Sequence, residues 1–443
     1  MSAWRRSLRD PVLLSALVCI LAVLASLPIP RVDGHWVGSD GLRYFATLRS
    51  LVFDHDLNFT NDYALLGVTY DARTPLGLPA NPFPIGPALL WLPFYLVGCG
   101  LAAGASALGF HLPLTGVGLL YEAPVCVGTA ILAGAGFLLL RRTVACVGAV
   151  SGTDADTAIL AMWWATPAIY YIVAEPSMSH ALAIFANAVF LRAWLGDDGL
   201  GSVRRAVRIG LAAALIGLVR WQDSVMLLLP ACELIVAVAR GRLPASRGAL
   251  CLGLCGLAFG IGMMPQVAMW RALYGSSVLV PQGNDFFQWL TPHPWQALFS
   301  LRHGLLTWHP VFALSLAGIA LAPRSRRGLA IGIFAMFLVF LYVNSAATRW
   351  WADDAFGGRR FVSLIPLFCL STAWCVAWLR ARIGSRALNV VLGALVFWNA
   401  LLFVQYRLGW IDRDLAPTWQ AFIVDRLLVP VRLARTLLRR FLA

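Results

Sequence analysis

The stretch RSRRGLAIGIFAMFLVFLYVNSA, residues 324–346, holds the pattern that decides the fold. Arginines at 324, 326 and 327 precede an apolar run, residues 328–346, that contains no charged side chain. A helix of about 20 apolar residues crosses the hydrocarbon core of a bilayer, and arginines gather at the cytoplasmic ends of such helices. The stretch therefore predicts a membrane-spanning helix that begins in the cytoplasm.

The rest of the chain repeats this pattern. Hydrophobic residues make up 60% of the sequence and charged residues 13%, whereas soluble domains average about 45–50% and about 25%. In hydrocarbon every backbone amide needs an internal partner, so helices are the default spanning form. We predict an all-α, polytopic transmembrane helical bundle, with apolar helices near 11–30, 84–104, 118–140, 157–174, 181–196, 207–219, 223–239, 249–270, 304–322, 328–346, 361–379 and 387–405.

The basic residues are all arginine and give the chain a formal net charge of +14. We attribute this charge to the cytoplasmic ends of the helices and to contact with anionic membrane lipids. The sequence contains no soluble basic domain and no recognisable DNA- or RNA-binding motif, so we expect no nucleic-acid partner.

Arginine clusters between the apolar runs assign the sides of the membrane. With the N-terminus inside, five segments fall on the outer side: 31–83, 175–180, 220–223, 272–303 and 347–360. If Arg141 and Arg142 are inside, only one full crossing fits between 84 and 140. We therefore expect the proline-rich run 84–104 to be tilted, re-entrant or interfacial.

We predict a transmembrane domain over 1–405 and an amphipathic C-terminal tail over 406–443. The tail carries arginines among Leu, Val and Phe, as interfacial helices do. Its side stays open, because the alternation of spans places it outside whereas its arginines favour the inside.

The unusual polar residues share the outer side. Charged groups near spans are costly and usually face a cavity or one another, so we expect one shared aqueous site; the alternative is a set of ordinary solvated loop residues. The residues are Asp40, Arg43, Asp54, Asp56, Asp62, Glu175, His180, Arg220, Gln222, Asp223, Asp285, His293, Arg302, His303, Asp353, Asp354, Arg359 and Arg360.

The first outer loop contains a second kind of helix. Ser39 or Asp40 can cap free amides, and the pattern predicts a helix from 40 to about 53. Asp40, Arg43 and Tyr44 then share one face, and Phe45, Leu48 and Val52 another. We expect an amphipathic helix on the bilayer surface, its polar face turned to the site; the alternative is that Asp40 is only an exposed cap.

These residue types suit one kind of chemistry. An acid at the membrane surface can act as general base toward a hydroxyl. Arginines hold a phosphate in a bidentate grip and stabilise its charge as it leaves, while a lipid tail lies between helices. Together they favour transfer from a polyprenyl-phosphate donor.

Five segments carry a resemblance to a known family. They are SDGLRYF (39–45), NPFPIGP (81–87), YYIVAE (170–175), LFSLRHGL (298–305), and WW (350–351) followed by FGGRRF (356–361). In this order they resemble the GT-C superfamily of integral-membrane glycosyltransferases, especially its protein O-mannosyltransferase and lipid A aminoarabinose transferase branch.

The resemblance implies roles for particular residues. Asp40 would be the catalytic base of an inverting enzyme, and Glu175 a second acid in the site. It also implies a bacterial inner membrane with the site facing the periplasm, and a polyprenyl-phosphate-linked sugar as donor. Candidate substrate-binding residues are Arg43, Tyr44, Arg73, His180, Arg220, Arg302, His303, Arg359 and Arg360.

The chain departs from the family pattern at two positions. Many relatives have a second acid directly after the first, where this chain has Gly41. The aminoarabinose branch has a lysine before the prolines, where this chain has Asn81, so phosphate contacts must come from the arginines. Some superfamily members use a divalent metal; the closer branch need not, and we assign no metal and no cofactor.

Two other classes of function remain open. A transporter or lipid flippase also needs many spans and buried charges, although we detect no internal repeat and no ionisable residues strung through the midplane. A membrane scaffold without catalysis is the second alternative. The acceptor stays unknown: a protein hydroxyl, a cell-wall polysaccharide or another lipid.

Overall fold

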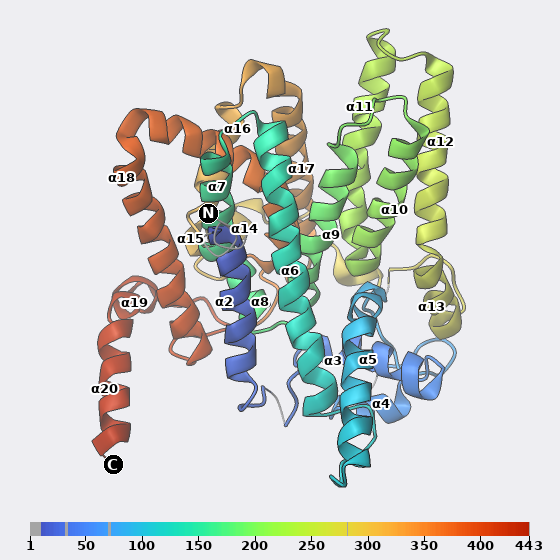
Figure 1. Cartoon of the computed structure of the whole chain (residues 1–443), viewed down its shortest axis with the longest axis vertical. Coiled ribbons are helices and arrows are strands. Elements are labelled where there is room, and N and C mark those ends of the chain that lie inside the picture. Colours follow the sequence, from blue (N-terminus) through green and yellow to red (C-terminus); the bar gives the residue numbers. More distant parts are fainter. Residues whose placement is uncertain (1–9, 32–33, 70–71, 281, 443) are drawn as a thin grey trace. The chain divides into compact units, whose positions relative to one another are not determined.

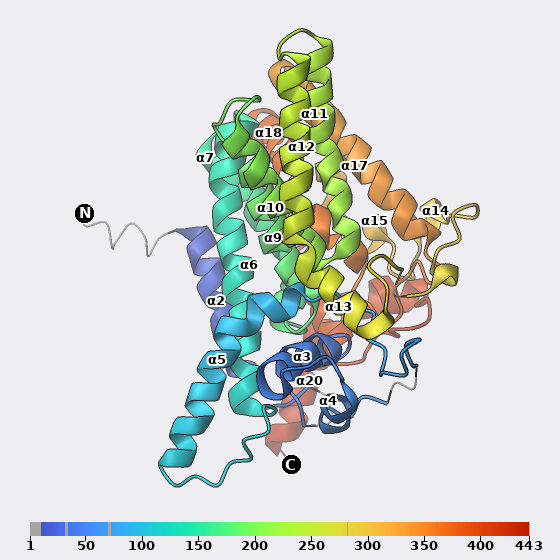
Figure 2. The same cartoon turned by 90° about the vertical axis from the view of Figure 1, so that its right-hand side faces the viewer.

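The computed structural model describes residues 10–31, 34–69, 72–280 and 282–442 of the chain. It is 71% helical and has no β-strand within those residues (Figure 1, Figure 2). The chain folds as two compact units. Unit 1 comprises Met1–Thr143 and Tyr171–Gly283, and unit 2 comprises Val144–Tyr170 and Asn284–Ala443.

Unit 1 contains the helices of the first outer loop and a group of long apolar helices. They are α2 (Pro11–Ser26), α3 (Gly41–Arg49), the π-helical turn η1 (Ser50–Asp54), α4 (Thr60–Leu65), α5 (Gly86–Ala107), α6 (Leu119–Gly148, whose end belongs to unit 2), α9 (Ser179–Trp194), α10 (Val203–Val219), the 3-10 helix η2 (Trp221–Leu227), α11 (Leu228–Ala239), α12 (Ala245–Gly262) and α13 (Met264–Tyr274).

Small residues let the helices of unit 1 approach closely. Helix α10 packs against both α9 and α12, and the three stand side by side in both views (Figure 1, Figure 2). A Cβ on Gly210 would lie 2.3 Å from the carbonyl oxygen of Cys255, and one on Gly262 would lie 2.4 Å from Cβ of Ala214. Close backbone contact through small residues is how helices associate in lipid.

A buried carboxylate fixes the start of the first outer loop. Glu122, in the first turn of α6, is fully buried. Its oxygens accept hydrogen bonds from the backbone N–H groups of Gly118, Trp36 and Val37, over 2.6 to 3.2 Å. The loop that leads into α3 is thereby tied to the beginning of α6.

Unit 2 is built around one long, broken helix. Its elements are α7 (Gly152–Trp164), α8 (Ala168–Val173, shared with unit 1), η3 (Asn284–Phe286), α14 (Pro294–Phe299), α15 (Leu305–Trp308), α16 (Phe312–Ala320), η4 (Arg324–Arg326), α17 (Arg327–Ala346), η5 (Arg359–Leu364), α18 (Ile365–Arg407), η6 (Gln420–Val424), α19 (Asp425–Leu427) and α20 (Val429–Leu442).

Helix α18 forms the centre of unit 2. Helices α7 and α16 pack against it, and a Cβ on Gly318 would lie 1.8 Å from the carbonyl oxygen of Ser371. The helix turns sharply at Gly384 (Figure 1), whose φ of 78° lies in the left-handed region that glycine adopts readily. Its two arms correspond to the predicted helices 361–379 and 387–405.

Six helical stretches in the described residues are long and apolar enough to cross a membrane. They are Gly86–Ala107, Leu119–Gly148, Trp221–Ala239, Ala245–Gly262, Arg324–Ala346 and Arg359–Arg407. The chain is thus a multi-pass integral membrane protein, as the sequence predicts. The first apolar run forms a shorter helix, Pro11–Ser26.

Several predicted spans need correction. The run 84–104 lies mostly in an unbroken helix, α5, that continues through Pro93, so the expected re-entrant form is wrong, whereas a tilted or interfacial helix stays a prediction. The predicted helices 157–174 and 304–322 are each interrupted, near Pro167 and Pro310, because proline removes a backbone donor and disfavours helix before it. Arg141 and Arg142 lie inside α6 and not in a loop.

The helix of the first outer loop forms where predicted and is largely buried within the protein, while its place at the bilayer surface stays a prediction. Helix α3 and η1 together cover residues 41–54. Residues 44–50 are all buried, because α4 and α5 pack against α3. The Asp40 side chain makes no capping hydrogen bond, so the predicted cap at that residue is wrong.

The tail contains a docked part and an amphipathic helix. In the docked part Arg426 is fully buried, and its guanidinium carbon lies 4.0 Å from the ring centre of Phe422 and 4.4 Å from that of Trp398. Helix α20 follows, with arginines among exposed leucines.

Candidate functional site

The beginning of α3 lies against the turn that precedes α9. The Gly38 N–H donates a 3.0 Å hydrogen bond to Oγ of Ser177. A Cβ on Gly41 would lie 2.3 Å from the same oxygen and 2.7 Å from the Ser177 carbonyl oxygen. Asp40 therefore borders the turn that Glu175 begins. A side chain at position 41 would collide with Ser177.

One turn further along α3, Tyr44 reaches the first turn of α9. Its hydroxyl donates a 3.0 Å hydrogen bond to Oγ of Ser179. Arg220, which follows α10, donates to the same oxygen over 3.5 Å and to Nδ1 of His180 over 2.8 Å. Tyr44 and Arg220 thus meet at Ser179, and Arg220 in turn binds His180; all three are predicted site residues.

This hydrogen-bond pattern sets the state of His180. A guanidinium donates hydrogen bonds and accepts none, so Nδ1 of His180 presents a lone pair to Arg220. His180 also packs on Tyr171, with 4.5 Å between ring centres.

A buried ion pair supports Arg220. Its Nε lies 3.8 Å from a carboxylate oxygen of Asp223, and the two residues are only 8% and 1% exposed. Asp223 was expected in the shared aqueous site but was not assigned a catalytic or substrate-binding role, and Ser179 was missed. A serine in the first turn of an apolar helix gives no distinguishing signal in a sequence, because serine is common there.

The other predicted residues of unit 1 differ in their surroundings. Arg43 is half-buried, with its guanidinium carbon 5.8 Å from the ring centre of Phe83. Asn81 donates 3.0 Å hydrogen bonds to the Arg43 carbonyl oxygen and to Oγ1 of Thr47, so it holds α3 in place. Arg73 is exposed and forms an isolated β-bridge with Pro79. It does not join the Tyr44–Ser179–Arg220 group.

A second buried ion cluster orders the first outer loop. Arg49 donates hydrogen bonds of 2.5 Å to Asp54 and 2.7 Å to Asp62, and one of 2.8 Å to the Thr115 carbonyl oxygen. Burial raises the pKa of Asp62 to about 6, although Arg49 opposes that shift. The predicted polar residues Asp54 and Asp62 therefore serve to hold the loop.

The four predicted residues of unit 2 lie together. His303, Arg359 and Arg360 line a narrow cavity of about 10 Å³ with Trp350, Trp351, Gly357 and Gly358, close to the volume that one water molecule needs. The guanidinium carbon of Arg302 stands 3.9 Å from the ring centre of Trp351. The sequence motifs LFSLRHGL and WW…FGGRRF thus meet at one place.

His303 has an unusual environment in this group. It is 3% exposed, has a φ of 62°, and its Nδ1 lies 2.8 Å from the Trp351 carbonyl oxygen, so Nδ1 carries a proton. Its Nε2 is buried and has no hydrogen-bond partner among the described residues. Burial lowers the pKa of His303 to about 4, and Arg359 and Arg302 add to the shift. The imidazole is neutral at pH 7, and Nε2 is a hydrogen-bond acceptor.

Most of the predicted residues therefore lie in two groups, one in each unit, and Arg73 belongs to neither. The residues that the structure describes include no group of three or more His, Cys, Asp or Glu side chains that could hold a metal ion. That all eleven predicted residues share one pocket stays a prediction. No protein-family model matches this chain, and no curated protein matches it.

Proposed function

We propose that this chain is a membrane glycosyltransferase that moves a sugar from a polyprenyl-phosphate donor to an acceptor hydroxyl. The main support is that the beginning of α3 packs against the 175–180 turn, so that Asp40 and Glu175 belong to segments in contact. One turn along α3, Tyr44 leads through Ser179 to Arg220. Two acids and a guanidinium thus belong to neighbouring segments of unit 1.

In the proposed reaction, the Asp40 carboxylate accepts the proton of the acceptor hydroxyl. The hydroxyl oxygen attacks the anomeric carbon while the bond from that carbon to the donor phosphate oxygen breaks, which inverts the anomeric centre. Polyprenyl phosphate leaves, and arginines stabilise its charge. Glu175 is a second acid in the site by the family resemblance.

The residues of unit 2 have two proposed roles. Arg302, Arg359 and Arg360 are candidates for the donor phosphate, because guanidinium groups bind phosphate oxygens in pairs. His303 suits a different group: its neutral Nε2 accepts a hydrogen bond and cannot donate one to a phosphate oxygen. We assign it to a hydroxyl of the donor sugar.

The proposed setting is the bacterial inner membrane, with the site facing the periplasm. The arginine pattern supports this orientation. The acceptor is a protein hydroxyl, a cell-wall polysaccharide or another lipid. Mass spectrometry of envelope glycans from a deletion strain would identify which of these loses its sugar.

The central test is transfer by the full chain in lipid nanodiscs. Polyprenyl-phosphate donors labelled in the sugar are supplied with an envelope extract as the source of acceptors. We expect Asp40→Asn to lose about 100-fold or more of the transfer rate, as loss of a general base does, with donor binding and thermal unfolding unchanged. Full activity of Asp40→Asn, or no transfer by the wild-type chain from any donor, would overturn the proposal.

Asp56→Asn is the matched control. Asp56 is exposed in the same loop, and its Oδ1 accepts hydrogen bonds from Ser50 and Asn58 that an asparagine oxygen also accepts. We expect this variant to keep full transfer. A transporter would instead move the labelled donor across a vesicle membrane with no new glycosidic bond, and Asp40→Asn would keep some of that movement.

A further inference from the structure

A groove of about 520 Å³ opens between α6, α9 and α10 in unit 1. This volume is within the roughly 300–1,000 Å³ of small-ligand sites. Its walls are apolar except for two arginines, Arg192 on α9 and Arg208 on α10. The other lining residues are Leu139, Val189, Ala193, Leu211, Ala212 and Leu215.

The groove lies far from the candidate site along the same helices. Arg192 is 13 residues beyond Ser179 on α9, and Arg208 is 12 residues before Arg220. At 1.5 Å rise per residue, each pair is separated by about 20 Å along the helix axis. The groove is therefore at the opposite end of α9 and α10, the end that the arginine pattern assigns to the cytoplasm.

The Arg192 guanidinium is accessible to a ligand, and that of Arg208 is accessible only in part, because its Nε and Nη2 are buried. The Arg192 and Arg208 side chains are 46% and 37% exposed. Arg208 contacts Asp198, and Arg192 lies 3.9 Å from Asp197, whose side chain is fully exposed. The exposed ion pair of Arg192 contributes little, whereas that of Arg208 is partly buried. A phosphate that takes hydrogen bonds from both arginines can replace the carboxylates.

We propose that this groove binds an anionic phospholipid of the cytoplasmic leaflet. Arg192 and Arg208 hold the phosphate of its headgroup, and an acyl chain follows the apolar wall toward Leu211 and Leu215. The charge of the two arginines matches the anionic headgroups that gather on the cytoplasmic surface of membranes, and basic pockets between helices bind such headgroups. This site is independent of the proposed transferase reaction.

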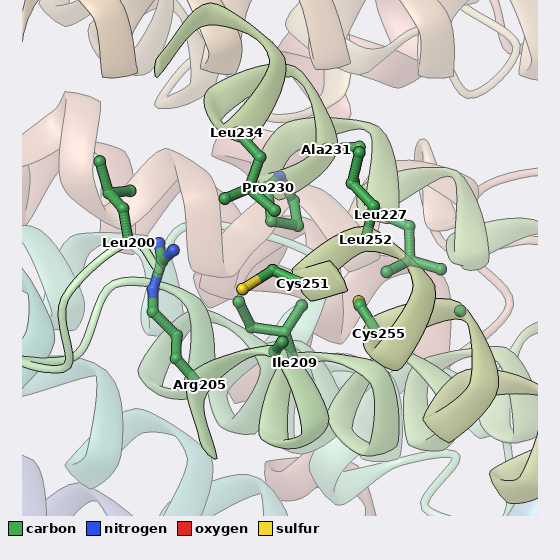
Figure 3. A pocket seen from close by; sticks show the side chains of 12 residues that line it. Leu200, Arg205, Ile209, Leu227, Pro230, Ala231, Leu234, Cys251, Leu252 and Cys255 are labelled. Carbon is green, nitrogen blue, oxygen red and sulfur yellow. The ribbon is translucent and has the colours of Figure 1, made fainter. Parts of the chain in front are cut away.

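A neighbouring pocket on the other side of α10 also contains an arginine, but that arginine is buried and already bonded within the protein. It lies between α10, α11 and α12, has a volume of about 180 Å³ and is almost entirely apolar (Figure 3). Its arginine, Arg205, is buried and already donates hydrogen bonds to the Trp194 carbonyl oxygen and to Glu233. That guanidinium is engaged within the protein, whereas that of Arg192 is exposed at the groove and that of Arg208 is partly exposed there.

The test is native mass spectrometry of the full chain released from nanodiscs of mixed phosphatidylglycerol and phosphatidylcholine. We expect the wild-type chain to retain phosphatidylglycerol selectively. Arg192→Gln with Arg208→Gln should weaken that binding by roughly 10- to 30-fold, since each arginine near the surface contributes about 1 kcal/mol. Asp198→Asn should strengthen it, because it removes the competing carboxylate.

The matched control is Arg240→Gln with Arg242→Gln, which removes the same charge from exposed positions outside the groove. It should leave the selectivity unchanged. The proposal fails if phosphatidylcholine is retained as tightly as phosphatidylglycerol, or if the Arg192 and Arg208 variant keeps the selectivity of the wild type. Since Asp198→Asn acts in the opposite direction, damage to the fold cannot imitate the expected pair of results.

Discussion

The guanidinium of Arg220 donates a 2.8 Å hydrogen bond to Nδ1 of His180. Arg220 also lies 3.8 Å from Asp223, and both members of this ion pair are buried. The arginine therefore has a carboxylate partner on one side and the His180 imidazole on the other. This arrangement makes its contribution to stability separable from its contribution to transfer.

Arg220→Gln should lower the free energy of unfolding by about 3 kcal/mol, because it leaves the buried Asp223 charge without that ion pair. Asp223→Asn in the same chain should restore much of the loss by removing the charge. Thermal unfolding of the single and double variants in detergent measures both effects. If the double variant is less stable than Arg220→Gln alone, the ion pair is not the source of the loss.

Gly41→Ala should destabilise the chain by about 1–3 kcal/mol, since its Cβ would meet Ser177 at less than 3 Å and overpacking carries that cost. Gly100→Ala, on α5, is the control, because a Cβ there meets nothing within 4 Å. It should be neutral or stabilising, as alanine favours helix over glycine. Equal unfolding temperatures for the two variants would contradict the close contact.

On acidification His303 should destabilise the folded chain, whereas the raised pKa of Asp62 acts in the opposite direction. Its folded-state pKa of about 4 lies below the ordinary value of 6.5, so the unfolded chain binds a proton that the folded chain does not. The neutral His303 imidazole therefore contributes fully to the free energy of unfolding above about pH 6.5. This contribution is lost as the pH falls toward 4, and the loss is about 3 kcal/mol at most. Unfolding midpoints of the wild type and of His303→Asn, measured from pH 7.5 to 4, give the contribution of His303 by difference.

His303→Asn isolates this effect. Asparagine does not titrate, it tolerates a positive φ, and its side-chain N–H can donate to the Trp351 carbonyl oxygen as Nδ1 does. We expect a flatter pH dependence for this variant than for the wild type. If both chains lose the same stability between pH 6.5 and 4, another group is responsible.

Arg426→Met should leave stability unchanged or raise it. Arg426 is fully buried, and its guanidinium nitrogens have no hydrogen-bond partner among the described residues; burial lowers its pKa to about 9. Methionine fills the space between Phe422 and Trp398 without the desolvation cost.

Arg426→Ala is the comparison, because it leaves a cavity and should cost about 2–4 kcal/mol. Thermal unfolding of the two variants separates packing from charge. A loss with methionine as large as that with alanine would show that the cation–π contacts outweigh the desolvation of the charge.

The apolar pattern predicted the helical class and most helix positions, because hydrophobic length and arginine placement are local properties of the sequence. The helix after Ser39 was also predicted, but its burial was not, since the cover by α4 and α5 depends on tertiary packing. The breaks at Pro167 and Pro310 were missed although proline is a local signal. In the candidate site, Arg220 and His180 were expected, whereas Ser179 joins them only through the fold.

The contact between Gly41 and Ser177 has a consequence for ancestry. Position 41 can gain an acid only if the turn near 177 moves away or becomes smaller, so the two positions must change together in evolution. A distant homologue with adjacent acids after its first span should therefore carry a different turn before the helix equivalent to α9. Such paired changes would help to identify homologues whose overall sequence similarity is too low to detect.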